Sequence, residues 1–325
     1  MSCTNTTPVD LNDCKAWCNL GITVNVGCTV VVNGAQYTRQ QCFVQALKIN
    51  SSNSTVWANL GTTVRPGETV VVDDVEYTRQ QCYVKALTCN PKNSSAWYNL
   101  AISMVREDET VEVQGQLYTE QQCYVQVLLV DPLNVSAWTN LGVNLKPSET
   151  VLVNGAQYTA QECQIQALEL DSTNSDVWNN LGNAVYSGST VVIGGKMYTR
   201  QQCYIQAVTI DPTAANCWCN LAFTINDDEP TAIGESKSIQ DMANRRVTVR
   251  DTSYTTQQCY LQALKYDPKN SNARWFICGT MHPGDVVAVS ADGRGRSGYF
   301  LRLKEVRSLE RVPESGSVPF DVAAP

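Results

Sequence analysis

The seven tryptophans of this chain recur at a nearly constant interval. Their spacings are 40, 40, 41, 40, 40 and 57 residues, and no tryptophan lies outside the series: Trp17, Trp57, Trp97, Trp138, Trp178, Trp218 and Trp275. Sequence repetition with a period of roughly 20 to 50 residues is typical of solenoids and similar arrays, in which each unit buries its apolar face against its neighbours. The sequence therefore predicts a tandem array of tryptophan-containing repeats.

The first part of each repeat is predicted to be a short helix. In the second repeat Trp57, Leu60, Gly61 and Val64 follow the i, i+3, i+4, i+7 spacing of one apolar helix face. The same segment recurs around other tryptophans as Trp-x-Asn-Leu-Gly. We interpret the tryptophan as a core residue.

A β-hairpin is predicted next in each repeat. In the second repeat two valine-rich stretches within residues 70–77 flank the turn Asp73-Asp74. In two other repeats the turn is Asn33-Gly34 or Asn154-Gly155, and these residue types adopt the positive φ angles that tight hairpin turns need. The simpler interpretation is that the hairpin valines cover helix ends. The alternative is a ribbon of hairpins along one edge, with strand edges that accept a partner or drive self-association.

A second helix is predicted to complete each repeat, and its first residue is well marked. A threonine is followed three residues later by Gln or Glu, which is the pattern of a capping box. The six threonines are Thr38, Thr78, Thr119, Thr159, Thr199 and Thr255. The helix is predicted to end before Pro91, Pro132, Pro212 and Pro268, because the residue before proline disfavours the helical conformation.

The Trp-x-x-Leu-Gly helix, the aromatic-x-x-Ala-Leu helix and the closing Asp-Pro-x-Asn turn resemble the tetratricopeptide repeat (TPR). The family unit is about 34 residues of helix-turn-helix, so we assign the extra six or so residues to the hairpin. The resemblance covers residues 14–282 and implies a mainly α fold, a TPR-like right-handed superhelix (α-solenoid) with a concave groove. One position departs from the family, since the residue four before the aromatic of the second helix is not consistently small: Arg39, Arg79, Glu120, Ala160, Arg200 and Thr256.

The sequence predicts four regions. Residues 1–13 are an N-terminal extension, and residues 14–282 hold six full repeats and the first helix of a seventh. Residues 283–312 are predicted to hold a partial hairpin and a basic capping helix within Tyr299–Arg311, and residues 313–325 a disordered tail. The sixth repeat carries 17 extra residues near 226–246, which are polar and predict a surface loop.

Composition argues against several functions. The net charge of −7 argues weakly against nucleic-acid binding, and no apolar run approaches the roughly 18 residues of a membrane span. The first residues lack a secretory signal, so we expect the 14 cysteines to be reduced and the protein to be cytoplasmic. Neither catalysis nor a metal or other cofactor is expected, because the only histidine is His282 and the repeated cysteines lie one repeat apart, too far for a shared metal. They are interpreted as small buried hydrophobes.

The asparagine two residues after each tryptophan is the best candidate for function. The TPR resemblance implies that these residues face the concave groove and bind the backbone of an extended peptide: Asn19, Asn59, Asn99, Asn140, Asn180 and Asn220. An amide offers a donor and an acceptor, which match a peptide unit whatever its side chain. The alternative is that each asparagine bonds within its own repeat. The seventh repeat has Ile277 at this place.

Neighbouring groove positions are uncharged and partly apolar. They include Tyr98 and Phe223, which we add to the candidate peptide-binding residues. The residues at these groove positions therefore predict a protein or peptide partner with a neutral, weakly apolar extended segment. The function predicted is that of a protein–protein interaction scaffold, and a self-assembling structural protein that uses the hairpin edges is the alternative.

Overall fold

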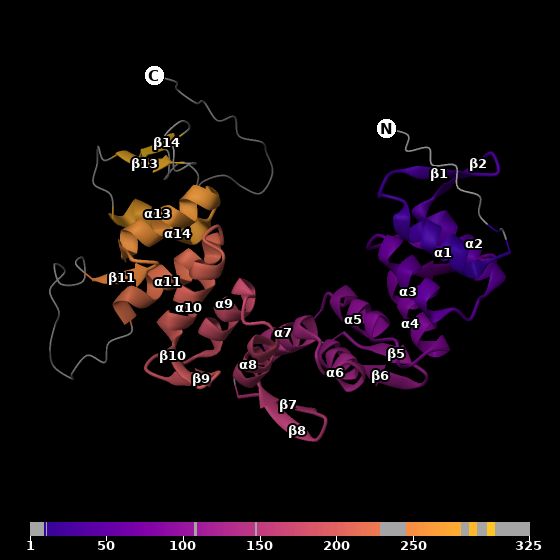
Figure 1. Cartoon of the computed structure of the whole chain (residues 1–325), viewed down its shortest axis with the longest axis horizontal. Helices are drawn as coiled ribbons and strands as arrows, with labels where there is room; N and C mark the ends of the chain where they lie inside the picture. Colours follow the sequence, from indigo (N-terminus) through magenta and orange to yellow (C-terminus); the bar gives the residue numbers. More distant parts are fainter. Residues whose placement is uncertain are drawn as a thin grey trace. The chain divides into compact units, whose positions relative to one another are not determined.

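The computed structural model describes residues 10, 12–106, 109–146, 148–227, 245–280, 286–290 and 298–302 (Figure 1). The chain forms two compact bodies, residues 1–163 and 164–325. The division falls inside one helix, α8 (Ala160–Leu170).

The first helix of each repeat, which we call helix A, is followed by a hairpin and then by helix B. The N-terminal body contains helices A α1 (Cys14–Thr23), α3 (Ser54–Thr63), α5 (Ser94–Ser103) and α7 (Val135–Asn144), and helices B α2 (Arg39–Ile49), α4 (Arg79–Cys89) and α6 (Glu120–Val130). Its hairpins are β1 (Thr29–Val32) with β2 (Ala35–Thr38), β3 (Thr69–Val72) with β4 (Val75–Thr78), β5 (Val111–Val113) with β6 (Gln116–Tyr118), and β7 (Thr150–Val153) with β8 (Ala156–Thr159).

The C-terminal body continues the same order. Its helices A are α9 (Ser175–Ala184), α11 (Ala215–Asp227) and α14 (Ser271–Thr280), and its helices B are α10 (Arg200–Ile210) and α13 (Thr256–Tyr266). Its hairpins are β9 (Thr190–Ile193) with β10 (Lys196–Thr199), β11 (Arg246–Val249) with β12 (Thr252–Thr255), and β13 (Val286–Ser290) with β14 (Gly298–Arg302). The predicted mainly helical fold with a hairpin in each repeat is confirmed.

Helix B begins at the capping box that the sequence predicts. In the second repeat the Thr78 amide donates to Gln81 Oε1 at 2.8 Å, and the Gln81 amide donates to Thr78 Oγ1 at 3.2 Å. These two bonds satisfy N–H groups that have no partner inside the helix. The Thr159–Glu162 pair makes the same two bonds. Helix A has its own cap, because Asn53 Oδ1 accepts from the Val56 amide at 3.2 Å.

Each hairpin is a separate two-stranded antiparallel sheet. In β3 the side chains alternate, so that Val70 and Val72 are buried and Val71 is exposed. The turn residues Asp73 and Asp74 have φ angles of 49° and 63°, as the turn requires. In the described part of the chain the strands of neighbouring hairpins do not pair with one another, so the use of their edges for a partner or for self-association stays a prediction.

The first strand of a hairpin packs on helix B of the preceding repeat. Strand β3 contacts α2, β5 contacts α4, and β7 contacts α6. At the tip of the β5–β6 hairpin Gln114 Nε2 donates to Thr88 O at 3.3 Å and so satisfies a carbonyl at the end of α4. The hairpins therefore tie consecutive repeats together.

Helices A and B of a repeat approach closely at a glycine. A Cβ atom added to Gly61 would lie 2.5 Å from a ring carbon of Tyr83, and one added to Gly21 would lie 2.6 Å from a ring carbon of Phe43. The glycine on helix A therefore makes the space that the aromatic ring of helix B fills. The repeated cysteine of helix B precedes this ring in five repeats and Gln164 in the fourth, and it is fully buried in all six, as predicted: Cys42, Cys82, Cys123, Cys163, Cys203 and Cys259.

The seventh repeat is out of register with its tryptophan. Asn270 caps α14 and accepts from the Ala273 amide, so Arg274 occupies the place that Trp57 has in the second repeat. Accordingly Arg274 Nε donates to Pro268 O, six residues back, as Trp57 Nε1 does to Ser51 O. Trp275 is 72% exposed, and the core interpretation is wrong for it.

The same register corrects two further expectations. Phe276, not Ile277, stands at the asparagine place of α14, and Ile277 is fully buried. Because Cys203 and Cys259 lie 56 residues apart, the sixth repeat is 16 residues longer than a 40-residue repeat, rather than 17. Most of the extra segment lies outside the described residues, between α11 and β11.

The start of the predicted capping helix is a strand instead. Residues 298–302 form β14, which pairs with β13 so that Val287 faces Leu301 and Val289 faces Tyr299. Aromatic and β-branched residues favour strands, and pairing with β13 outweighs the helical spacing. Residues 303–325 lie outside the described residues, as do residues 1–9 and 11.

Candidate partner-binding face on the first helices

One face of the A helices carries exposed apolar side chains at a fixed place, five residues after the core tryptophan. In the N-terminal body Ile22, Ile102 and Val143 are 52%, 52% and 58% exposed. The C-terminal body has Phe223 at this place, 56% exposed. We call this surface the A face. It is the surface that the sequence predicts as the groove.

The asparagines of the A face donate to the preceding repeat. Asn140 Nδ2 donates to the hydroxyl of Tyr98 at 3.1 Å, and Asn220 Nδ2 donates to Asn179 Oδ1 at 2.9 Å. A weaker contact of the same kind joins Asn59 Nδ2 to Cys18 Sγ at 3.8 Å. In each case the acceptor directly follows the core tryptophan of the preceding repeat. Neither bond lies within the asparagine's own repeat, so the alternative stated above is wrong for these residues.

The other asparagines of this row differ in their hydrogen bonding, because the residue at the acceptor place of the preceding repeat differs. The residue that would accept from Asn99 is Ala58, which has no polar side-chain atom. Asn19 is exposed at the first repeat, and Asn180 is half-buried on α9. Asn99 also lines a small cavity of about 190 Å³ with Tyr98, Ser94, Ser95, Asn134 and Ser136. Within the described residues Asn99 and Asn180 therefore donate no side-chain hydrogen bond to the preceding repeat, unlike Asn59, Asn140 and Asn220.

A polar cluster lies where α5, α6 and α7 meet on the A face. The rings of Tyr98 and Tyr124 lie edge to face with centroids 5.8 Å apart. Asn140 Nδ2 contacts both hydroxyls, at 3.1 Å for Tyr98 and 3.3 Å for Tyr124. Glu120 Oε1 accepts from the Tyr124 hydroxyl at 3.3 Å and from Asn144 Nδ2 at 2.9 Å. Burial and, next, the Glu120 carboxylate raise the pKa of Tyr124, so its hydroxyl stays protonated.

A related cluster lies on the A face of the C-terminal body. The Tyr204 hydroxyl donates to Asn183 Oδ1 at 2.8 Å. The Arg200 guanidinium carbon lies 6.0 Å from the ring centroid of Tyr204 and 5.9 Å from that of Phe223. A cation over an aromatic face is stabilised by the ring quadrupole. Phe223 is therefore held beside a positive charge.

Sequence reasoning missed the charged members of both clusters. Glu120 and Arg200 were noted only as departures from the family's small residue. In the second repeat the equivalent Arg79 Nε donates to Val64 O at 2.7 Å, at the end of α3. The sequence did contain a signal for these charged residues. Large side chains at this place of helix B need space between helices A and B, and this space reaches the A face.

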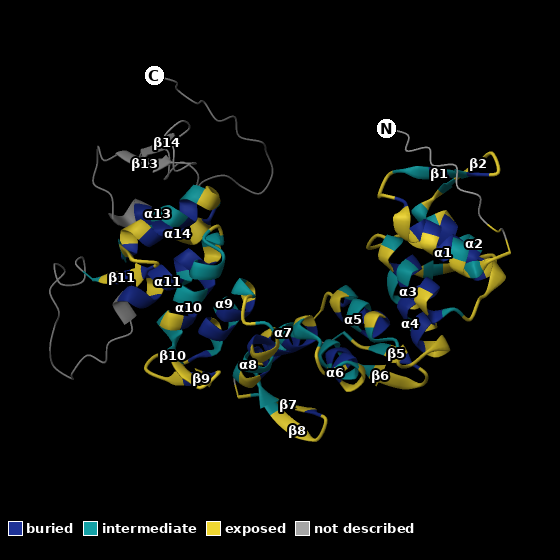
Figure 2. Ribbon diagram, viewed as in Figure 1, coloured by how far each residue is buried: buried dark blue, intermediate teal, exposed yellow. Residues whose placement is uncertain are grey.

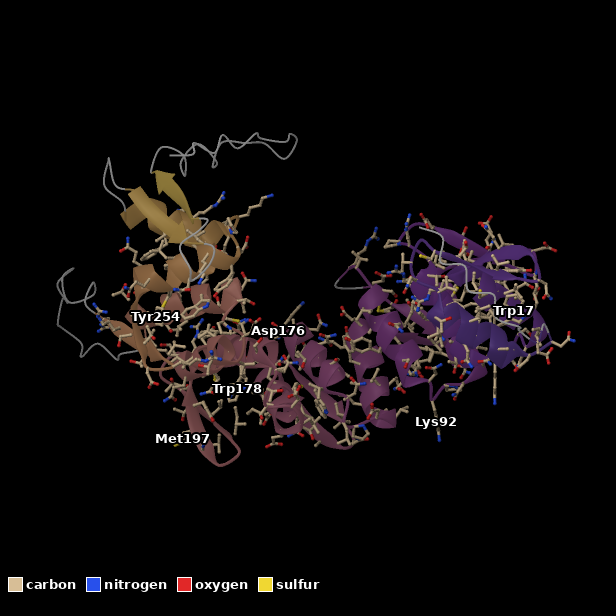
Figure 3. The ribbon with its side chains drawn as sticks, turned by 45° about the horizontal axis from the view of Figure 1, so that its top comes forward. Trp17, Lys92, Asp176, Trp178, Met197 and Tyr254 are labelled. Carbon is tan, nitrogen blue, oxygen red and sulfur yellow. The ribbon has the colours of Figure 1, made fainter. Side chains whose placement is uncertain are left out.

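The outward face of the hairpins is a second exposed apolar surface. Val71, Leu117, Leu152, Val192 and Met197 are each more than half exposed. Figure 2 shows the exposed tips of the hairpins, and Figure 3 labels Met197 beside the tip of β9–β10, away from Trp178 on α9.

A cavity lies between the second and third hairpins. Its volume is about 450 Å³, and its lining includes Val75, Tyr77, Val84, Lys85 and Val111. Lys85 Nζ lies 5.7 Å from the centroid of the Tyr77 ring.

The thiols and carboxylates form no metal cluster in the described part of the chain. Burial raises the pKa of Cys82, Cys123 and Cys203 to about 12, so these thiols are protonated at neutral pH. Among the described helices, none has the length and apolar character that a membrane crossing requires.

Residues 82–122 match the family model of the tetratricopeptide repeat. No curated protein matches the sequence. Among solved structures, the crystal structure of YrrB, described as a TPR protein with an unusual peptide-binding site, is 12% identical. The match covers 73% of this chain and 98% of that chain, with a TM-score of 0.42. Residues 82–122 span the end of α4, helix α5, the β5–β6 hairpin and the start of α6, and the same order of elements recurs along the chain. The repeated units are therefore similar to the tetratricopeptide repeat, in a lengthened form in which a β-hairpin joins the two helices of each repeat.

Proposed function

We propose that this protein is an interaction scaffold whose A face binds an extended, mainly uncharged segment of a partner protein. The observation that carries the proposal is the recurrence of an exposed apolar side chain at one place in the A helices of the first, third and fourth repeats, at Ile22, Ile102 and Val143. Solvent-exposed apolar side chains that recur on one surface are typical of interaction sites.

The asparagines complete this proposed site. Asn99 is the best candidate to bind the backbone of the segment, because its preceding neighbour is Ala58 and its amide lines a cavity. Asn59, Asn140 and Asn220 donate through Nδ2 to the preceding repeat, and each still has a carbonyl oxygen with which to accept. We retain Asn19 and Tyr98 in the proposed site of the N-terminal body, and Asn180 and Phe223 in that of the C-terminal body.

The test is peptide binding to the full chain and to two matched double variants. Ile102→Ser with Val143→Ser removes apolar area from the A face, whereas Val71→Ser with Leu117→Ser removes it from the hairpins, and these four residues are 52–59% exposed. We expect the A-face variant to lose about tenfold or more in affinity for library peptides, since each buried side chain is worth about 1.5–3 kcal/mol. Equal binding by wild type and A-face variant would overturn the proposal.

The second candidate is self-association through the hairpins. The exposed row on the hairpins and the cavity beside Val75 and Val111 favour it. Light scattering over a range of concentrations would show a molar mass that rises with concentration in the wild type and falls to that of a monomer in the hairpin variant. A constant monomeric mass in the wild type would contradict this candidate.

A further inference from the structure

The polar cluster around Glu120 differs from the rest of the A face because it contains a negatively charged carboxylate. The equivalent residue is arginine in the first, second and fifth repeats, as Arg39, Arg79 and Arg200, so the third repeat reverses the sign of the charge. Glu120 is half-buried at the start of α6. A carboxylate in this setting interacts more strongly with a cation than one in open solvent does, because the local dielectric constant is lower.

The Glu120 carboxylate has an open side. Both of its hydrogen bonds, from Tyr124 and from Asn144, go to Oε1. Within the part of the chain that the structure describes, no cation pairs with Glu120, and the ion pair present there is Arg65 with Glu68 at 3.8 Å. Oε2 is therefore available to a donor from outside the chain.

The surroundings of this carboxylate suit a long cationic side chain. Tyr98 supplies a half-buried aromatic ring in this cluster, packed edge to face on the buried ring of Tyr124, and an accessible ring of this kind stabilises a nearby ammonium or guanidinium group. The exposed Ile102 and Val143 lie on α5 and α7, the helices that hold the cluster on either side. They offer apolar surface for the methylene groups that lysine and arginine carry.

We propose that the Glu120 cluster binds a lysine or arginine side chain of the partner segment and so fixes the position of that segment on the A face. This inference rests on the proposed function and names the partner more closely: an extended segment that is mainly uncharged and has a basic residue opposite the third repeat. Glu120 takes the ammonium or guanidinium group through Oε2, while Oε1 stays bonded to Tyr124 and Asn144. Because Arg39 and Arg79 precede it, a second basic residue one or two repeats away is disfavoured.

The test compares three fluorescein-labelled nonapeptide sets bound to the full chain. The sets share an Ala/Val/Ser/Gln host and carry lysine, glutamine or glutamate at each position in turn. We expect the best lysine peptide to bind about tenfold or more tightly than the matching glutamine peptide, and the glutamate peptide to bind most weakly, since an accessible charged pair contributes on the order of a factor of ten. The lysine preference should decrease as salt is raised.

Two substitutions then locate the preference. Glu120→Gln keeps an oxygen for Tyr124 and Asn144 but removes the charge, so the preference for lysine over glutamine should fall to about one. Glu120→Arg copies the residue of the neighbouring repeats and should make the glutamate peptide the tightest. Glu112→Gln, an exposed carboxylate on β5, is the control and should change nothing. Circular dichroism checks that each variant is folded.

The outcomes separate the two proposals. A-face binding with no lysine preference in the wild type, or a preference that survives Glu120→Gln, overturns the Glu120 assignment and leaves the scaffold proposal standing. If no peptide binds, or if Ile102→Ser with Val143→Ser does not weaken binding, both proposals fail.

Discussion

The indole of Trp57 and the phenol of Tyr77 lie edge to face with ring centroids 4.9 Å apart. Trp57 is on helix α3 and Tyr77 on strand β4, so the pair fastens a hairpin to helix A of its own repeat. Trp57 Nε1 also donates to Ser51 O at 2.8 Å, in the turn before α3. One side chain thus joins three segments of the repeat. The same ring pair recurs in five other repeats, for example as Trp17 with Tyr37 and Trp218 with Tyr254.

Replacing Trp57 by alanine should destabilise the protein strongly. Trp57 is 4% exposed, and truncating a buried aromatic residue costs about 3–5 kcal/mol. The matched control is Trp275→Ala, which removes a side chain that is 72% exposed and should change the free energy of unfolding by less than about 0.5 kcal/mol. Urea unfolding followed by far-UV circular dichroism measures both. Similar losses in the two variants would contradict the register assigned to α14.

That register shows how far sequence reasoning reaches. The capping boxes and the Asn33-Gly34 turn were predictable because each depends on residues at most three positions apart. The period of the tryptophans was less reliable, since it followed one residue type. The helix cap Asn270 and the buried Ile277, rather than Trp275, determine which side chains of α14 face the core.

Contacts between repeats were the least predictable feature. Whether Asn140 would reach Tyr98, 42 residues earlier, depends on how two helices A pack and on the residue that the preceding repeat offers. The packing of β5 on α4 also depends on how two neighbouring repeats pack against each other. The candidate face could be inferred from the resemblance, but its charged member Glu120 required the packed structure.

Replacing Asn140 by alanine should cost about 1 kcal/mol, because the hydroxyls of Tyr98 and Tyr124 lose a shared donor. Asn99→Ala is the control at the equivalent place. The Ala58 side chain, which stands at the acceptor place of the preceding repeat, cannot accept a hydrogen bond from Asn99. The midpoint of urea unfolding should therefore not move. Under the proposed function Asn99→Ala still weakens peptide binding. Suppose instead that Asn99→Ala destabilised the chain as much as Asn140→Ala. The inference that an asparagine stabilises the fold only where the preceding repeat offers a side-chain acceptor would then be wrong.

Replacing Gly61 by valine should destabilise the second repeat by about 1–3 kcal/mol, the usual cost of overpacking. A Cβ atom there lies 2.5 Å from a ring carbon of Tyr83, which is itself buried, so the ring must move. Thr62→Val is the control, because it places the same side chain on the exposed side of the same helix. Equal unfolding midpoints for the two variants would show that helices α3 and α4 do not approach as described.

The buried thiols should make the fold sensitive to alkali. Burial raises the pKa of Cys82, Cys123 and Cys203 from an ordinary value of 9.0 to about 12. Below pH 9 the thiols are protonated in both states and the stability is fully present. As pH rises from 9 towards 12 only the unfolded chain loses these protons, so stability is lost, by at most about 1.4 kcal/mol per thiol and pH unit.

This loss can be measured as the urea midpoint between pH 7 and 10. Cys82→Ala should lower the midpoint at pH 7 but flatten its decline above pH 9, whereas Cys89→Ala, at an exposed position, should leave the decline nearly unchanged. Iodoacetamide at pH 8 should alkylate Cys89 faster than Cys82 in the native protein, and both after unfolding. A midpoint that stays constant to pH 10 would contradict the burial of these thiols as neutral groups.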